Sequence, residues 1–273
     1  MVNKKWIIRG ILAMLAISLL FLVTIIIKKG NIPAIIKQDS ASVSGLLAQA
    51  KNFESKGDTL DAKAIYQKLL NDFSNSAEVN NWQKKTEDLN IKLLFSPTIT
   101  PHSIFYEIKP GDALAKIAKE YKTTPELIKR SNRLSDNKIF PGRKIKVWIS
   151  PFNILIDKSQ NTLMLKTNEE AIKTYTVSTG TNNSTPVGTF KITNKLINPT
   201  WFKAGAAIPA SSPDNVLGSR WLGFNMAGYG IHGTIDPESL GKQATQGCVR
   251  MSNSDAEELY DIIPVGTEVT VVD

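Results

Sequence analysis

The sequence predicts a multidomain chain that ends in a mostly β domain over residues 152–273. A small βααβ module at 104–150, a short helical segment and one transmembrane helix precede it. Three observations predict this order. Apolar residues recur at helical spacing between residues 43 and 95, and at every second position in short runs from Phe152 onward. A long uncharged apolar run lies near the N-terminus.

The uncharged run extends from Gly10 to Ile27 and is long enough to cross a bilayer core. Basic residues flank it on both sides: Lys4, Lys5, Arg9, Lys28 and Lys29. A cleaved signal peptide is the alternative, but no small-x-small cleavage site follows the run. We therefore expect residues 1–30 to form an uncleaved single-pass membrane anchor, with the rest of the chain outside the cytoplasm.

The formal net charge of +8 is unevenly spread along the chain. Residues 1–42 carry +5, residues 101–150 carry +6, and residues 151–273 carry −3. A basic segment can bind nucleic acid, an anionic membrane or an anionic polymer. The anchor and the acidic C-terminal domain argue against nucleic acid, so we expect no nucleic-acid partner.

Residues 43–95 show a pattern of amphipathic helices that is interrupted at Gly57 and Asp58. The pattern resembles a tetratricopeptide repeat, but only one repeat is visible, and such repeats normally stack on neighbours. The segment is therefore either a plain helical spacer or a docking unit for a protein partner. Residues 96–103 are rich in Pro, Ser and Thr and predict a linker, in which His102 is expected to be solvated.

Residues 104–150 read as strand, helix, helix and strand, with Asp112 as the expected cap of a helix beginning at Ala113. This arrangement resembles a LysM domain, which binds glycans containing N-acetylglucosamine. The resemblance implies glycan contacts from residues in and beside the turns: Gly111, Asp112, Ala113, Asn132 and Pro141. Ala113 stands where the family usually has Thr or Ser, which would weaken binding. The surplus of basic residues would suit anionic wall polymers, or would simply form a solvated face.

The chain has one cysteine, Cys248, and two histidines, of which His232 lies outside the linker. They are 16 positions apart, in the glycine-bearing segments GYGIHGT and TQGCVRMSN. A thiol attacks a carbonyl as its thiolate, and a nearby imidazole can take its proton. An inert buried cysteine is the alternative. No ligand-spaced cluster is present, so we expect neither a metal nor a cofactor.

The stretches TPVGTFKI, RWLGFN, GYGIHGT and SLGKQATQGCVRMSN together resemble the YkuD-type catalytic domain of L,D-transpeptidases. The resemblance covers residues 152–273 and implies a mostly antiparallel β-sandwich with a short helix. It implies that Cys248 is the nucleophile and His232 the base, with Thr245 and Arg250 at further motif positions. Gln246 stands where many members carry a second histidine, so His232 would act as the only base.

Glycines beside the two central residues suit this chemistry. Gly247 would let substrate approach Cys248. The backbone N–H groups of Gly247 and Cys248 would bind the oxyanion that forms on attack. Gly233 would let a backbone carbonyl fix the tautomer of His232. Asp236 is the nearest carboxylate that could do so instead.

Three side chains are candidates for substrate contacts. Arg250 suits a substrate carboxylate, and the alternative for it is a structural ion pair. Tyr229 and Trp221 could line the cleft, as could Trp201, and the alternative for each aromatic residue is a place in the core.

The resemblance implies a peptidoglycan L,D-transpeptidase in the bacterial cytoplasmic membrane, with its catalytic domain on the extracytoplasmic side. The enzyme would release D-alanine from tetrapeptide stems and form 3→3 cross-links through a cysteine thioester. Stem peptides would bind at the catalytic site and glycan at the LysM module. The alternatives are an L,D-carboxypeptidase that hydrolyses at the same site and a non-catalytic wall-binding scaffold.

Overall fold

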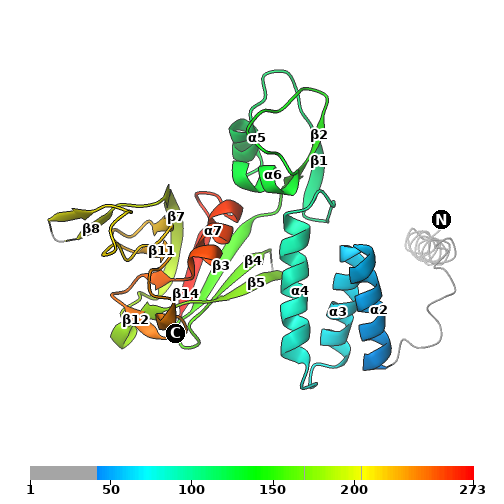
Figure 1. The fold of residues 1–273 in the computed structure, drawn as a ribbon, viewed down its shortest axis with the longest axis horizontal. Helices are drawn as coiled ribbons and strands as arrows, with labels where there is room; N and C mark the ends of the chain where they lie inside the picture. The colour runs from blue at the N-terminus through cyan, green and yellow to red at the C-terminus, as the bar shows by residue number, and fades with distance from the viewer. Residues whose placement is uncertain (1–41, 169, 204) are drawn as a thin grey trace, which may run out of the picture. The chain divides into compact units, whose positions relative to one another are not determined.

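A computed structural model of the chain describes residues 42–273, apart from residues 169 and 204 (Figure 1). The anchor predicted at 10–27 lies outside these residues. Within them, no helix combines the length and the apolar character needed to cross a membrane. The chain divides into two compact units, residues 1–48 and residues 49–273. The contacts described below belong to the second unit.

The helical segment has three helices, α2 (Val43–Lys56), α3 (Thr59–Asp72) and α4 (Val79–Leu94). Their bounds follow the apolar spacing in the sequence closely. Gly57, with a φ of +80°, separates α2 from α3 in a conformation that other residues rarely adopt. Helices α3 and α4 pack against each other and bury apolar side chains that include Tyr66, Leu69 and Trp82.

The next module has the predicted order of strand, helix, helix and strand: β1 (Ser103–Glu107), α5 (Leu114–Glu120), α6 (Pro125–Ser131) and β2 (Lys144–Trp148). Strands β1 and β2 pair antiparallel, and the helices cover them over a small core. Thr124 caps α6 as its sequence indicates, since its hydroxyl accepts from the Leu127 N–H at 2.9 Å.

The start of α5 differs from the prediction. The helix begins at Leu114, and Ala113 occupies the N-cap position without a side-chain cap bond. Asp112 does not cap it, because its carboxylate accepts from the Lys109 N–H and the Tyr106 hydroxyl, each at 2.8 Å.

The C-terminal domain is mostly β and is built on one eight-stranded sheet in the order β13-β11-β10-β7-β14-β3-β4-β5. Its strands are β3 (Phe152–Asp157), β4 (Thr162–Thr167), β5 (Glu170–Thr176), β7 (Gly188–Ile197), β10 (Arg220–Phe224), β11 (Gly230–His232), β13 (Val249–Arg250) and β14 (Glu268–Val272). Two pairs, β14 with β3 and β11 with β13, are parallel. The remaining pairs in this sheet are antiparallel. Two short pairs accompany it: β6 (Thr179–Gly180) with β12 (Gln243–Thr245), which is parallel, and the antiparallel hairpin of β8 (Trp201–Lys203) with β9 (Ala206–Ile208).

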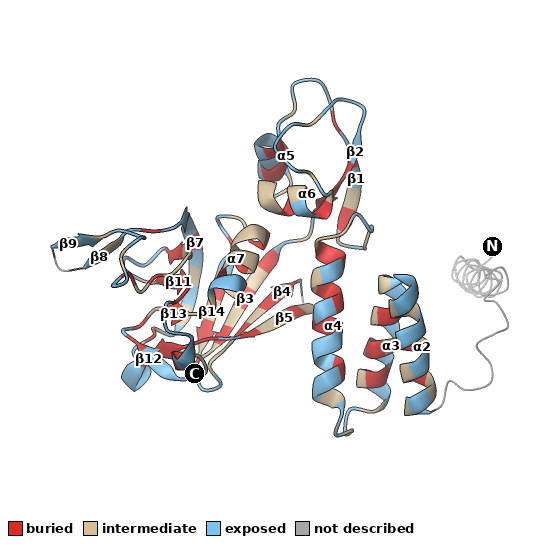
Figure 2. Cartoon of the chain, viewed as in Figure 1, coloured by how far each residue is buried: buried red, intermediate tan, exposed pale blue. Residues whose placement is uncertain are grey.

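Strand β7 joins two arms of this sheet. Its first half pairs with β14 and its second half with β10. Buried residues alternate along β3 and β4 (Figure 2), and buried residues from both arms meet in one core that includes Ile154, Leu165, Leu222, Ile231 and Val249. The expected sandwich therefore takes the form of two arms of a continuous sheet that share β7.

Helix α7 (Asn253–Ile262) packs against β10 and β11. Lys195 of β7 secures its C-terminus by donating to the carbonyls of Tyr260 and Ile263 at 2.6 and 2.9 Å. Burial lowers the pKa of Lys195 to about 8, and the negative end of the helix dipole favours the cation at this position.

The three modules of residues 49–273 share packing. Leu94 of α4, Leu127 of α6 and Trp148 of β2 belong to the same buried cluster as the core of the β domain. The buried Nζ of Lys146 donates to the carbonyls of Leu93 and Ser96 at the end of α4, at 2.7 and 2.9 Å. Helix α4 and the small module are thus packed onto the β domain.

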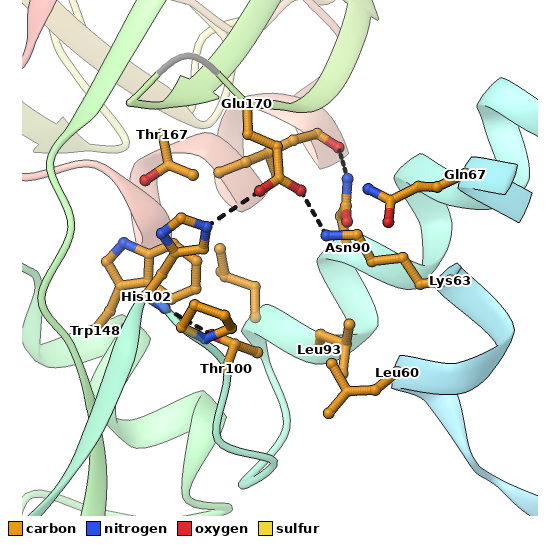
Figure 3. A pocket seen from close by; sticks show the side chains of 13 residues that line it. Leu60, Lys63, Gln67, Asn90, Leu93, Thr100, His102, Trp148, Thr167 and Glu170 are labelled. Carbon is orange, nitrogen blue, oxygen red and sulfur yellow. Dashed lines mark hydrogen bonds and ion pairs between the residues drawn. The ribbon is translucent and has the colours of Figure 1, made fainter. Parts of the chain in front are cut away.

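The environment of His102 overturns the expectation of a solvated linker histidine (Figure 3). Its Nδ1 lies 3.0 Å from the Ser150 hydroxyl, and its Nε2 lies 3.1 Å from the Glu170 carboxylate. Its ring stacks on Trp148, and Lys63 of α3 reaches the same carboxylate at 2.5 Å. Although burial opposes the shift, Lys63 and His102 hold the pKa of Glu170 below its usual value. The sequence prediction failed because these partners are remote along the chain.

Candidate active site

Neighbouring strands carry His232 and the segment that follows Cys248. Strand β11 pairs with β13 in parallel, with Ile231 opposite Val249 and His232 opposite Arg250. Ile231 and Val249 are fully buried in the core, so alternation places His232 and Arg250 on the other face. Cys248 immediately precedes β13. The 16-position spacing in the sequence thus becomes a juxtaposition of two adjacent strands.

His232 is held in one orientation. The residue is 3% exposed, and its ring stacks against Trp221, its cross-strand partner, with a centroid distance of 6.1 Å. Its Nδ1 lies 2.6 Å from the carbonyl oxygen of Gly233. Since a carbonyl only accepts, Nδ1 carries the proton and Nε2 keeps a free lone pair. Burial lowers the pKa of His232 to about 4, Arg250 adds to this effect, and the Gly233 bond opposes it.

Cys248 lies at a cavity of about 290 Å³. The cavity is lined by Leu196, Pro199, Thr200, Trp201, Phe202, Leu217, Trp221, Gly228 and Cys248. The thiol donates to the Gly228 carbonyl at 3.3 Å. Burial raises its pKa, while the Gly230 N–H and Arg250 oppose the rise. The shifts at Cys248 and His232 together favour a neutral thiol and a neutral imidazole at pH 7.

The Thr245 side chain stabilises the turn before Cys248 through two hydrogen bonds. The Thr245 hydroxyl donates to the Cys248 carbonyl at 2.6 Å and accepts from the Gly247 N–H at 3.1 Å. Gly247 has a φ of +128°, and a Cβ there would lie 2.8 Å from Cε1 of Tyr229. The turn therefore requires glycine at this position.

The predicted pair of oxyanion donors needs a correction. The Gly247 N–H is already bonded to Thr245, so it is not a free donor in this structure. The Cys248 N–H has no hydrogen-bond partner within residues 42–273 as the structure describes them. It is the donor of the two that remains available.

Arg250 makes the structural ion pair that was the alternative to a substrate contact. Its Nη1 donates to the Ser239 hydroxyl at 2.8 Å and lies 3.5 Å from the Asp236 carboxylate. Asp236 therefore pairs with Arg250, and the Gly233 carbonyl holds the His232 ring instead. The Nε of Arg250 is buried without a partner in the described part of the chain. This Nε–H group is enclosed by the protein and does not line the cavity at Cys248.

The aromatic candidates have different positions. Trp221 and Trp201 line the cavity, and the Trp221 indole donates to Asn194 at 3.0 Å. Tyr229 instead packs against the domain core and the Gly247 backbone. A place in the core was the alternative to lining the cleft. Sequence reasoning missed Phe202 of β8, which is 78% exposed and lines the cavity. The adjacent aromatic pair Trp201-Phe202 was the available signal.

The five candidate glycan-binding residues of the small module fall into two groups, those bonded within the module and those exposed in loops. Asp112 accepts from the Tyr106 hydroxyl, which raises the pKa of Tyr106 to about 12. The Asn132 amide donates to the Ile128 and Lys146 carbonyls, both at 2.8 Å, and accepts from the Lys146 N–H. These two side chains hold the module together. The other three candidates, Gly111, Ala113 and Pro141, are exposed in loops.

Comparisons with known proteins identify both domains. The family model of the YkuD L,D-transpeptidase catalytic domain matches residues 151–271, and that of the LysM domain matches residues 106–148. YkuD of Bacillus licheniformis, which is named as an L,D-transpeptidase, is 32% identical over 176 residues, covering 62% of this chain and 98% of that protein. The chain belongs to the L,D-transpeptidase family. Both predicted resemblances are therefore confirmed.

Two further L,D-transpeptidases show how far the similarity extends. YqjB of Bacillus subtilis, also named as an L,D-transpeptidase, is 41% identical over 126 residues, covering 44% of this chain and 70% of that protein. A solved L,D-transpeptidase from Mycobacterium smegmatis is 22% identical with a TM-score of 0.39, covering 48% of this chain and 64% of that one.

Proposed function

We propose that this L,D-transpeptidase family member forms 3→3 cross-links in peptidoglycan, with Cys248 as nucleophile and His232 as general base. One observation carries the proposal. The thiol opens on an apolar cavity beside a strand whose histidine keeps Nε2 unprotonated. A neutral base next to a neutral thiol suits a proton transfer that accompanies attack, rather than a preformed ion pair.

In the first half-reaction, the Cys248 sulfur attacks the carbonyl between the L-centre of the third stem residue and D-alanine. The thiol proton passes to Nε2 of His232, and the Cys248 N–H donates to the oxyanion. Collapse breaks the C–N bond, His232 protonates the leaving amine, and D-alanine departs. The acyl group remains on sulfur as a thioester.

In the second half-reaction, a side-chain amine of another stem attacks the thioester. His232 takes the amine proton and returns it to the sulfur as the C–S bond breaks, which restores the thiol. The guanidinium of Arg250, whose side chain keeps 12% of its surface exposed, would bind a substrate carboxylate near the site. The aromatic walls formed by Trp201, Phe202 and Trp221 would cover the apolar parts of the stem.

The N-terminal modules would bring this site to its polymer. Residues 1–30 would anchor the protein in the bacterial cytoplasmic membrane, with residues 43–273 on the extracytoplasmic side. The LysM module would bind glycan and raise the local concentration of stems. Its packing onto the β domain would hold the glycan at a fixed position relative to Cys248.

Incubation of the full-length protein with tetrapeptide-bearing muropeptides, followed by mass spectrometry, tests the proposal. We expect release of D-alanine and accumulation of 3→3 dimers, and neither product from Cys248→Ala. Tripeptide monomers without dimers would instead favour the L,D-carboxypeptidase. A wild-type protein that binds muropeptides but releases no D-alanine would favour the non-catalytic scaffold.

A further inference from the structure

Asn253, the first residue of α7, is bonded to two backbone segments beside the candidate active site. Its Oδ1 accepts from the Ser219 N–H and from the Thr234 N–H, each at 3.0 Å. Its Nδ2 donates to the Thr234 carbonyl at 2.8 Å. One amide therefore ties the start of α7 to the segment before β10 and to the segment after β11.

The bond to Thr234 leads directly to the imidazole. The Gly233 carbonyl and the Thr234 N–H are the two ends of one planar peptide group. The oxygen of this group accepts from Nδ1 of His232 at 2.6 Å, and its N–H donates to Asn253. Rotation of the peptide plane would break both bonds together. Hydrogen bonds that are linked in this way also strengthen one another.

Two glycines provide the space for the Asn253 amide. A Cβ on Gly233 would lie 2.1 Å from its Oδ1, and a Cβ on Gly218 would lie 2.2 Å from it. Gly218 also has a φ of +61°, which favours glycine. The glycine after His232 is therefore needed for the approach of Asn253 as well as for the local backbone.

We propose that Asn253 is a positioning residue that fixes the tautomer of His232 through the Gly233–Thr234 peptide group. Asn253 holds the plane, the plane directs its carbonyl to Nδ1–H, and Nε2 is left unprotonated for the thiol proton. The catalytic consequence rests on the proposed function. The effect on the tautomer does not, because it is a property of the folded protein alone.

Nitrogen NMR of the imidazoles tests the first step. The full-length protein has only two histidines, so a tag-free sample labelled with ¹⁵N-histidine gives few signals, which His102→Gln assigns. At pH 7 we expect the wild-type His232 signals of one tautomer, with a pyrrole-like Nδ1 and a pyridine-like Nε2. In Asn253→Ala we expect averaged shifts from a mixture of both tautomers. Asn253→Asp retains an acceptor for the two N–H groups and should lie closer to wild type.

Kinetics test the second step. We expect Asn253→Ala to lower kcat roughly 10- to 100-fold, the loss typical of a misplaced catalytic group, while KM changes little. Asn90→Ala is the matched control, because the Asn90 amide bridges α4 to the Ala171 and Ile172 carbonyls, away from His232. This control should leave both the tautomer and kcat as in wild type.

A folded Asn253→Ala protein with wild-type imidazole shifts would overturn the proposal, as would equal losses of kcat in Asn253→Ala and Asn90→Ala. Should Asn253→Ala not fold, Asn253→Ser supplies the same comparison, since serine suits a helix N-terminus but is too short to reach both N–H groups. If the wild type lacks transpeptidase activity, the proposed function fails and the NMR comparison still decides the role of Asn253.

Discussion

The carbonyl oxygen of Gly233 lies 2.6 Å from Nδ1 of His232, and this contact determines which imidazole nitrogen can accept a proton. If a carboxylate accepted the Nδ1–H hydrogen bond instead, its negative charge beside the ring would favour the imidazolium form. A backbone carbonyl fixes the tautomer without that charge. The buried ring therefore stays neutral well below the usual pKa of histidine.

The pH dependence of the reaction should reflect this low pKa. The acid limb of kcat/KM reports the free enzyme's essential base, and the pKa of His232 is about 4. We expect kcat/KM to stay flat from pH 8 to about pH 5 and to fall only as His232 becomes protonated near pH 4. Steady-state rates with a muropeptide donor measure this profile. An acid limb near the ordinary histidine value would show that the ring is not buried and neutral as described.

Stability should also depend on His232 in acid. The folded pKa is lowered from 6.5 to about 4, so between these values the unfolded chain binds more protons than the folded protein. The folded state therefore loses stability as pH falls from 6.5 towards 4, by roughly 3 kcal/mol over the whole window. Urea denaturation at pH 7 and pH 4.5 should show a larger loss for wild type than for His232→Gln. Equal losses in both proteins would refute the assigned burial effect.

Thr245 should be essential for the shape of the nucleophile turn. Thr245→Val removes the hydroxyl that bonds the Cys248 carbonyl and the Gly247 N–H while it keeps the side-chain shape. We expect a loss of about 1–3 kcal/mol in unfolding free energy and a kcat lowered roughly 10-fold or more. Thr245→Ser keeps the hydroxyl and serves as the control. Equal kcat values for the two variants would contradict this role.

Lys146 should stabilise the junction between α4 and the LysM module. Lys146→Met leaves the Leu93 and Ser96 carbonyls without their donor, which should lower the unfolding free energy by about 1–3 kcal/mol. Lys144→Met, an exposed change on the same strand, should stay within about 0.5 kcal/mol of wild type. Chemical denaturation of both variants measures the difference. A Lys146→Met protein as stable as wild type would show that the buried cation contributes nothing.

Local patterns in the sequence predicted the elements well. Helical spacing and Gly57 located the helices of residues 43–95, and the Thr124-Pro125 pair located the start of α6. The motifs around His232 and Cys248 located the candidate site because the family similarity covers them. These signals lie within short stretches of sequence, so they could be found without a structure.

Contacts between remote residues could not be predicted in this way. Lys146 meets Leu93, and His102 meets Glu170, because separate modules pack together, and no periodicity in either segment records its partner. The occupied Gly247 N–H depends on the side-chain rotamer of Thr245, which a motif does not specify. For the same reason the role of Asn253, visible only as the last letter of a motif, required coordinates.

Intact-mass spectrometry of the full-length protein after exposure to a carbapenem tests the central claim most directly. We predict one covalent adduct per chain, located at Cys248 by peptide mapping, absent in Cys248→Ser and formed much more slowly in His232→Ala. No adduct on folded wild-type protein, or an adduct at another residue, would contradict the assignment of Cys248 as the nucleophile.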